Sequence, residues 1–341
     1  MSLQRIAIIK LSSIGDCVLA SPVPRALKRA DPQRHITWVV EERQRELVET
    51  NPFVDQVITV AGPDFRSLLA AGREVRRRQF DAILDLQGIL KSSLLVVMSG
   101  CRRRVTGSFA RAAARRVATE IADTRGVRHA ALLYLRCAEP LDADVSDPKL
   151  IAPVTDEDRQ FADLLLSENQ CPPWPSPYPA IRNQPEAPSV VEGQSAMPLF
   201  GLNPGASRSD KRWPPERFAE VAARLASEFQ MRPILFGGPN DQEIAESVRR
   251  IAPSTLIDVV GRTTLRQLTA LAARCRLFLT NDSGPMHLAC AAGTRVVAVF
   301  GASNPAFTGP FGDGHLVCWK ARSYEEARRR GTELLAALSA E

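Results

Sequence analysis

The stretch RIAIIKLSSIGD, from Arg5 to Asp16, predicts the fold of the first half of the chain. Its run of apolar residues is typical of a buried strand, and the small residues that follow predict a turn at Ser12–Gly15. A helix is expected from about Asp16 to Arg29, since Asp31 and Pro32 then stop it. Strand, turn and helix in this order form the first unit of a parallel βα sheet.

The same rhythm continues along the chain on both sides of one irregular stretch. In the first half, strands are expected at 35–41, 56–60 and 80–86, and helices at 44–50, 65–78 and 91–98. In the second half, strands are expected at 199–203, 232–238, 256–261, 277–282 and 296–301, and helices at 214–229, 241–251, 265–274 and from 284. The fold class is therefore α/β, with two doubly wound Rossmann-like domains facing a central cleft.

The irregular stretch sets the expected domain boundaries. Residues 171–198 contain eight prolines and lack helical or alternating periodicity, which predicts a linker or surface insertion. We expect a first domain at 1–170, a second at 199–320, and a C-terminal amphipathic helix at 321–341. The length of 341 residues agrees with two domains at roughly 100 to 200 residues each.

Composition narrows the class of protein. Hydrophobic residues make up 45% and charged residues 24% of the chain, values close to those of folded globular proteins, so disordered and coiled-coil classes are excluded. The seven cysteines are scattered and never form CxxC, which favours a reducing compartment over a disulfide framework or a zinc site. Because no signal-peptide pattern or membrane-length apolar run is present, a cytoplasmic location is expected.

The positive charge is concentrated in one stretch. Residues 73–136 contain 14 basic and 5 acidic residues, a local charge of +9 against +6 for the whole chain. Such a stretch suits an anionic membrane surface, a phosphorylated substrate or nucleic acid, although single arginine clusters are as often solvated helix faces. Nucleic acid is the weakest of these partners, since aromatic residues are only 6% and no nucleic-acid motif is present.

The turn SSIGD, Ser12 to Asp16, is a candidate site because of its position. Ligands of doubly wound sheets bind at the carboxyl ends of strands, and the amides that start a helix attract anions. A dinucleotide site would need GxGxxG, and Gly15 alone is present, so a nicotinamide cofactor is disfavoured. Asp16 also has a structural interpretation, because an aspartate in the first helical turn commonly caps the helix.

Two more candidate sites follow predicted strands in the second half. The loop NPGASRSDKRWPPERF, from Asn203, brings hydroxyls and cations suited to phosphate, including Ser207 and Lys211. A polar loop with a packed tryptophan is the alternative interpretation. The segment NDSGPMHL, from Asn281, starts a helix whose first amides would accept an anion. His287 in this segment faces either a ligand or the core, and the other histidines lack partners at metal-ligand spacing, so no metal site is expected.

The ordered set SSIGD, SDKRWPPERF and NDSGPMHL, with WVVEE at 38–42, DLQGILKSS at 85–93 and FGGPNDQE at 236–243, resembles the heptosyltransferases of glycosyltransferase family 9. The resemblance covers nearly the whole chain, and the 87–92 segment is more similar to the heptosyltransferase I branch, which adds heptose to Kdo. It implies a GT-B fold and an inverting transfer from ADP-heptose to the inner core of lipopolysaccharide, without a metal or a cofactor.

The resemblance also implies roles for individual residues. Asp16 matches the general base, and Lys211 matches the lysine that faces the donor phosphates. The donor-binding matches are Ser207, Asp282, Ser283, Gly284, His287 and Glu243, with Asp241 as the other candidate for a ribose-binding carboxylate. The acceptor-binding candidates are Ser13, Gly15, Gln87, Lys91, Arg102, Arg103 and Arg104.

Partners and alternatives follow from the same comparison. The acceptor would be Kdo-lipid A, whose phosphates and carboxylates suit the arginine stretch, and the enzyme would dock on the inner face of the bacterial inner membrane. A GT-B nucleotide-sugar epimerase is the main rival among enzymes, and a non-catalytic sugar-nucleotide binding protein is the rival outside catalysis. An epimerase would turn over the donor alone, whereas a transferase requires an acceptor.

Overall fold

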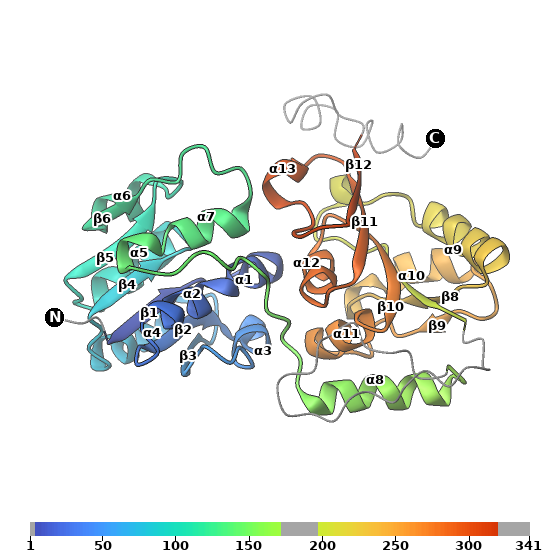
Figure 1. Ribbon diagram of the computed structural model, residues 1–341, viewed down its shortest axis with the longest axis horizontal. Coiled ribbons are helices and arrows are strands. Elements are labelled where there is room, and N and C mark those ends of the chain that lie inside the picture. The colour runs from blue at the N-terminus through green and yellow to red at the C-terminus, as the bar shows by residue number, and fades with distance from the viewer. Residues whose placement is uncertain (1–3, 172–196, 320–341) are drawn as a thin grey trace. The chain divides into compact units, whose positions relative to one another are not determined.

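The computed structural model describes residues 4–171 and 197–319. The chain divides into two compact units, Met1–Pro153 and Val154–Glu341. Each unit contains one six-stranded, fully parallel sheet with helices packed against it (Figure 1). Each unit therefore has the doubly wound α/β architecture that the strand and helix rhythm predicts.

The first sheet has the strand order β3-β2-β1-β4-β5-β6. Its strands are β1 (Arg5–Ile9), β2 (His35–Glu41), β3 (Gln56–Val60), β4 (Ala82–Asp85), β5 (Arg103–Gly107) and β6 (Glu120–Ala122). Its helices are α1 (Ile14–Ala20), α2 (Pro22–Ala30), α3 (Arg45–Val48), α4 (Phe65–Arg77), α5 (Leu90–Met98), α6 (Ala112–Val117) and α7 (Ala130–Arg136).

The second sheet has the order β12-β11-β10-β7-β8-β9. Its strands are β7 (Leu199–Asn203), β8 (Arg232–Leu235), β9 (Ile257–Asp258), β10 (Cys275–Asn281), β11 (Arg295–Phe300) and β12 (Leu316–Trp319). The helices of this unit are α8 (Asp156–Glu168), α9 (Pro215–Phe229), α10 (Gln242–Arg249), α11 (Leu265–Ala272), α12 (Gly284–Ala291) and α13 (Pro305–Thr308).

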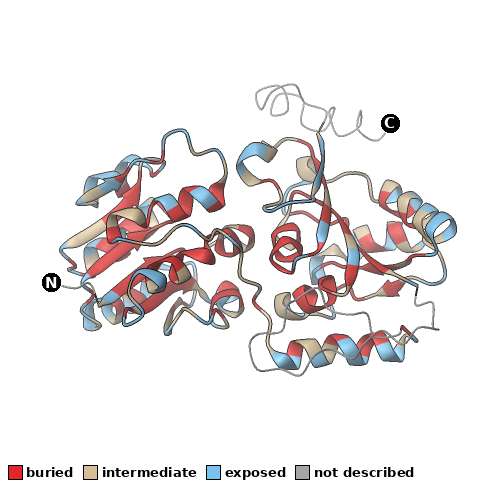
Figure 2. Cartoon of the chain, in the orientation of Figure 1, coloured by how far each residue is buried: buried red, intermediate tan, exposed pale blue. Residues whose placement is uncertain are grey.

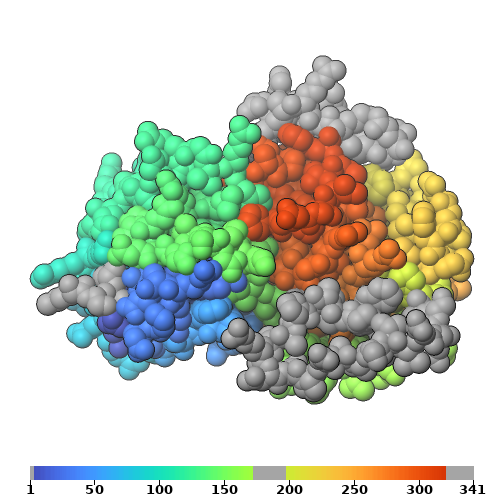
Figure 3. All heavy atoms as spheres, in the orientation of Figure 1, coloured from blue at the N-terminus to red at the C-terminus, as the bar shows by residue number. Residues whose placement is uncertain are grey.

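The strands form the cores because both of their faces are covered. In the first unit, alternate residues of the central strands, such as Ile9 and Ile83, pack against α4 and α5. In the second unit, Phe200 and Leu279 pack in the same way against α9 and α10. Figure 2 shows the central strands of both sheets mostly in the buried class, and the atoms within each unit pack closely over the face seen in Figure 3. Burial on both faces explains the near-continuous apolar runs in the sequence.

The expected boundary between the two domains needs correction. The first unit ends at Pro153 and not at 170, because α8 packs against α11 of the second unit. Two ion pairs fix α8 there, Arg266 with Asp158 at 3.2 Å and Arg274 with Asp163 at 2.5 Å. Most of the expected proline-rich linker, and the expected C-terminal helix after residue 320, lie outside the described residues.

The expected helix from Asp16 to Arg29 is two helices. It begins earlier, at Ile14, and breaks at Ser21 because Pro22 has no N–H to donate to the preceding turn. The break lets Pro22 start α2 as a first-turn proline. Asp16 therefore lies in the first turn of a short helix of seven residues that follows directly from β1.

Candidate functional site

The candidate segments of each unit lie where the strand order of its sheet reverses. After β1, the first sheet grows through β2 and β3 on one side and through β4 to β6 on the other, and the second sheet repeats this about β7 and β10. The loops that leave β1 and β4 therefore diverge at the carboxyl edge of the sheet, as do those after β7 and β10. In open α/β sheets this is the place where ligands bind.

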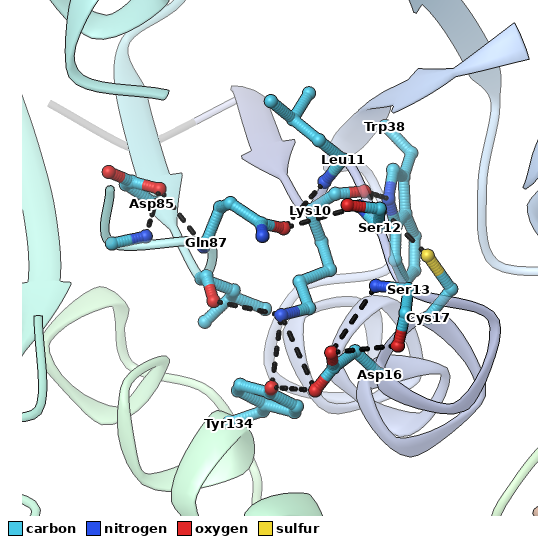
Figure 4. Close-up of polar contacts among 12 residues, drawn as sticks. Lys10, Leu11, Ser12, Ser13, Asp16, Cys17, Trp38, Asp85, Gln87 and Tyr134 are labelled. Atoms are coloured by element: carbon cyan, nitrogen blue, oxygen red, sulfur yellow. Dashed lines mark hydrogen bonds and ion pairs between the residues drawn. The ribbon is translucent and has the colours of Figure 1, made fainter. Parts of the chain in front are cut away.

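In the first unit, Gln87 holds the loop after β1 in place. Its side-chain Oε1 accepts hydrogen bonds from the backbone amides of Leu11 at 3.0 Å and Ser12 at 3.3 Å (Figure 4). Gln87 is in turn fixed by Asp85, which accepts from the amides of Gln87 and Gly88, both at 3.0 Å. The loop from β4 thus braces the loop from β1 across the point of reversal.

The carboxylate of Asp16 has donors on both oxygens. Oδ2 accepts from the amide of Ser13 at 3.2 Å and from its hydroxyl at 3.1 Å. Oδ1 accepts from the Tyr134 hydroxyl at 2.6 Å and lies 3.6 Å from the ammonium of Lys10. The contact with the Ser13 amide is the helix cap expected of such an aspartate, so the capping interpretation is confirmed alongside the candidate site.

The surroundings of Asp16 keep it ionised. Burial raises the pKa of this carboxyl, but the Lys10 cation and the hydrogen bonds from Tyr134 and Ser13 outweigh it and lower the pKa below the ordinary value of 3.8. The Asp16 side chain is still 34% exposed, so a substrate can reach it. Asp16 is therefore a charged, accessible proton acceptor at neutral pH.

The remaining candidates of the first unit have mixed outcomes. Ser13 and Gly15 lie beside Asp16 at the start of α1, and Gln87 lies next to them as a brace for the loop. Lys91 instead forms an ion pair with Glu41 at 2.8 Å, which ties α5 to the carboxyl end of β2. All four residues are at the same edge of the sheet as Asp16.

The arginines at 102–104 lie elsewhere. Arg103 and Arg104 are the first two residues of β5, and the strand runs about 13 Å from there to Gly107 at the carboxyl edge. Arg103 pairs with Glu120 at 2.8 Å and donates to the Pro140 carbonyl at 2.6 Å. The structure does not bring this cluster to Asp16, because the parallel register of β5 places it at the opposite, amino edge of the sheet.

In the second unit, Lys211 and Asp282 join two of the sequence motifs. Lys211, in a single 3-10 turn after β7, donates to Asp282 Oδ2 at 2.7 Å, and the hydroxyl of Ser303 donates to the same oxygen. The side chain of Asp282 is 5% exposed and that of Lys211 is 22% exposed. The pair therefore presents its ammonium, rather than its carboxylate, toward solvent.

Two asparagines at strand ends fix the loops around this pair. Asn203 donates from Nδ2 toward the Gly205 carbonyl at 3.1 Å and the hydroxyl of Ser283 at 3.1 Å. Asn281 accepts from the Trp213 amide at 2.9 Å and donates to the Pro204 carbonyl at 2.8 Å. The loop after β7 is thus bonded at both of its ends to the loop after β10.

The other donor-binding candidates are distributed around this edge. Ser283 and Gly284 form the start of α12, and His287 is 4% exposed within that helix. Ser207 is exposed in the loop after β7. Of the two acidic candidates, Asp241 lies so close to Gly205 that a Cβ added at Gly205 would come within 2.8 Å of the Asp241 carboxyl group. Glu243 is exposed on α10. The structure therefore favours Asp241 over Glu243 as a group at this site.

Comparison with known proteins identifies the family. The sequence model of glycosyltransferase family 9 (heptosyltransferase) matches residues 68–337. The chain belongs to this family. It is accordingly a glycosyltransferase, and the resemblance noted in the sequence is confirmed.

Relatives of this glycosyltransferase align over nearly its whole length. The lipopolysaccharide core heptosyltransferase OpsX of Haemophilus influenzae is 24% identical, over 97% of this chain and 89% of the relative. Lipopolysaccharide heptosyltransferase 2 of Salmonella typhimurium is 27% identical over 96% and 92%. Lipopolysaccharide heptosyltransferase 1 of Escherichia coli is 25% identical over 92% and 91%, so identity does not separate the two branches.

Solved structures confirm the GT-B fold. A family 9 glycosyltransferase from Veillonella parvula has a TM-score of 0.80 and 26% identity, covering 100% of this chain and 98% of the other. The ADP-heptose lps heptosyltransferase II of E. coli has a TM-score of 0.74 and 22% identity, covering 99% of both chains. The fold expected from the strand rhythm is thus shared with heptosyltransferase structures.

Some residues at these candidate sites escape sequence reasoning. Lys10 carries a signal in retrospect, because a lysine that closes an apolar strand must find a partner for its charge. Tyr134 carries none, since it lies 118 residues from Asp16 on a helix without a distinctive pattern. Ser303 reaches Asp282 from the loop after β11, and only the fold brings Asn203 to Ser283.

Among residues 4–171 and 197–319, no three His, Cys, Asp or Glu side chains come together as a possible metal site. None of the helices in these ranges combines the length and apolarity needed to span a bilayer.

The position of Arg103 predicts a structural phenotype. Arg103→Gln removes the ion pair with Glu120 and weakens the contact with Pro140, which joins β5 to the segment before α8. We expect a lower midpoint of thermal unfolding and an unchanged Michaelis constant for the acceptor substrate. Differential scanning fluorimetry and initial-rate kinetics measure the two quantities, and a raised acceptor constant at unchanged stability would contradict this assignment.

Proposed function

We propose that this glycosyltransferase moves heptose from ADP-heptose to the Kdo region of the lipopolysaccharide inner core, with inversion at the anomeric carbon. The family match and the full-length relatives named as lipopolysaccharide heptosyltransferases support this donor and this pathway. The observation that carries the mechanism is the ionised, accessible carboxylate of Asp16 at the point of strand reversal. The type of acceptor follows from the resemblance of the 87–92 segment to the heptosyltransferase I branch.

The first unit supplies the base in this proposal. A hydroxyl of the acceptor sugar attacks C1 of the heptose, the bond from C1 to the β-phosphate oxygen breaks, and its electron pair leaves with ADP. The proton of the attacking hydroxyl passes to Asp16 as C1 develops oxocarbenium character. Attack on the face opposite the leaving group inverts the anomeric configuration.

The second unit supplies the cation that the departing ADP requires. The Lys211 ammonium has three N–H donors. One of them bonds to Asp282, and the others remain for phosphate oxygens. The amides at the start of α12, from Gly284, favour the same negative charge. Asp282, which also accepts from Ser303, holds Lys211 at the carboxyl edge. In this proposal a fixed protein cation does the electrostatic work, and the reaction proceeds without a metal or cofactor.

A transfer assay tests the activity and the acceptor together. ADP-heptose is incubated with Kdo-lipid A, with the product that already carries one heptose, and without acceptor, and the products are weighed by mass spectrometry. We expect one heptose to be added to Kdo-lipid A alone. Addition only to the heptosylated acceptor would overturn the Kdo assignment, and conversion of the donor without acceptor would indicate an epimerase.

Matched substitutions separate the two halves of the mechanism. Asp16→Asn keeps the size of the side chain but removes the proton acceptor, so kcat should fall roughly 10²- to 10⁴-fold while ADP affinity is retained. Lys211→Met removes the cation and should weaken ADP binding. Calorimetric titration with ADP and initial rates measure the two effects.

Arg208→Met is the control for Lys211→Met. It removes one positive charge from the same loop, but Arg208 is 65% exposed and pairs with Asp210 rather than with Asp282. ADP affinity should change much less in this variant. Equal losses in the two variants would show that net loop charge, and not the placement of Lys211, holds the donor.

We also propose that the enzyme works at the anionic cytoplasmic face of the inner membrane, where its lipid acceptor is found. The local charge of +9 over residues 73–136 supports this location. Sedimentation with vesicles should show binding that rises with the fraction of anionic lipid and weakens as salt is added. Binding that is equal on neutral and anionic vesicles would contradict the electrostatic account.

A further inference from the structure

Two buried polar side chains contact the Asp16 carboxylate and take no part in the proposed proton transfer. The Lys10 side chain is 4% exposed and follows β1 directly. Tyr134 is 5% exposed and comes from α7. Figure 4 shows both pointing at the carboxylate from the side opposite Ser13.

Three contacts hold the buried cation of Lys10. Its ammonium donates to the Tyr134 hydroxyl at 3.0 Å and to the Leu86 carbonyl at 3.5 Å, and lies 3.6 Å from Asp16 Oδ1. It also lies 4.7 Å from the centre of the Tyr134 ring. A buried ammonium without a counterion is strongly disfavoured, so the charges of Lys10 and Asp16 are mutually dependent.

The hydrogen bonds of the Tyr134 hydroxyl run in one fixed direction. Burial, and then the negative charge of Asp16, raise the pKa of Tyr134 well above its ordinary value, so its hydroxyl stays protonated. It accepts from Lys10 and donates to Asp16 Oδ1, while Ser13 donates to Oδ2. With a donor on each oxygen from opposite sides, the carboxylate is held in one orientation.

This arrangement matters most when substrates are bound. An acceptor that covers Asp16 removes water from it, and desolvation favours the neutral carboxylic acid, which cannot take a proton. Lys10 opposes this effect from inside the protein, where bound substrates do not displace it. The cation beneath the carboxylate therefore preserves the charge that the reaction uses.

We infer that Lys10 and Tyr134 are positioning residues for the base: together they hold Asp16 in its reactive orientation and keep it ionised when substrates bury it. The inference rests on the proposed role of Asp16 as the proton acceptor. Lys10, directly after β1, and Tyr134 of α7 thereby act on the reaction through Asp16.

Tyr134→Phe tests the inference because it removes the hydroxyl and keeps the ring. We expect kcat to fall roughly 10- to 100-fold, since a misplaced catalytic group loses activity on this scale, with ADP affinity unchanged. The hydrogen bond from Tyr134 lowers the pKa of Asp16, so its loss raises that pKa. Profiles of kcat report ionisation in the enzyme–substrate complex, so when they are extended below about pH 5 the ratio of variant to wild type should fall further as pH decreases.

Lys10→Met is the second variant, and we expect it to shift the pH profile further than Tyr134→Phe does. The Lys10 cation is the largest of the influences that lower the pKa of Asp16, so its removal leaves burial opposed only by the hydrogen bonds from Tyr134 and Ser13. The acid limb of the profile should move to higher pH than in Tyr134→Phe. Near-ultraviolet circular dichroism of each variant verifies the native fold, and Tyr134→Phe alone decides the test if Lys10→Met does not fold.

Two controls separate positioning from packing. Phe109 packs edge-on against Tyr134, with ring centres 6.2 Å apart, and donates no hydrogen bond to Asp16. Phe109→Leu should therefore leave the acid limb where it is in the wild type. In the Asp16→Asn background, Tyr134→Phe should cause little further loss of kcat, because residues that act through one group are not additive.

The outcomes also separate this inference from the proposed function. Full turnover by Asp16→Asn would overturn the base assignment itself. A large loss in Asp16→Asn, combined with an unchanged pH profile in Tyr134→Phe, would leave the base in place and overturn the positioning role. An equal loss from Tyr134→Phe in the presence and absence of Asp16 would likewise show a packing effect.

Discussion

The pairing of β1 with β4 and of β7 with β10 is the constraint on which both sites depend. In each unit the first strand lies at the centre of the sheet because later strands add to it from opposite sides. Parallel strands then direct all of their carboxyl ends to one edge, and the loops from the two central strands must separate there. The carboxylate of Asp16 and the ammonium of Lys211 follow from this geometry, because each lies shortly after the central strand of its sheet.

Each site contains a salt bridge with one buried partner and one more accessible partner, and the accessible charge has the opposite sign in the two sites. In the first unit the cation, Lys10, is buried, and the carboxylate of Asp16 is the accessible partner. In the second unit the carboxylate, Asp282, is buried and the cation of Lys211 is the more accessible partner. Each buried charge fixes its partner and partly neutralises it. An accessible carboxylate and an accessible ammonium thus both belong to a salt bridge that is buried at one end, and they are the base and the phosphate-facing cation of the proposed mechanism.

The sequence predicts the sheets well because their strands are buried on both faces. The strands at 35–41 and 56–60 lie where their apolar runs predict them. β5 and β6 escape detection, since β5 begins with two arginines and β6 has three residues, of which Ile121 is half exposed. The sequence pattern around Pro22 predicts one continuous helix, so it does not reveal the break between α1 and α2. Sequence patterns therefore find elements that bury apolar side chains and miss those that are defined by pairing with a neighbour.

The candidate site could be predicted only as far as single segments. The aspartate and the lysine that end up in the two sites lie in motifs beside turns, so the local pattern identifies them. Tyr134 is joined to Asp16 by the packing of α7 on α1, and no local pattern contains that information.

The arginine stretch shows why charge counts do not locate a site. Each arginine's role depends on the end of the strand at which it lies. Arg103 is the first residue of β5 and pairs with Glu120 at the amino edge, whereas Arg111 follows the same strand, at the start of α6. The backbone amide of Arg111 donates to the carbonyl of Gly88, which places it beside the loop that braces Asp16. Two arginines eight residues apart thus belong to opposite edges of one sheet. The direction of β5, which composition cannot reveal, decides which of them lies at the same edge as Asp16.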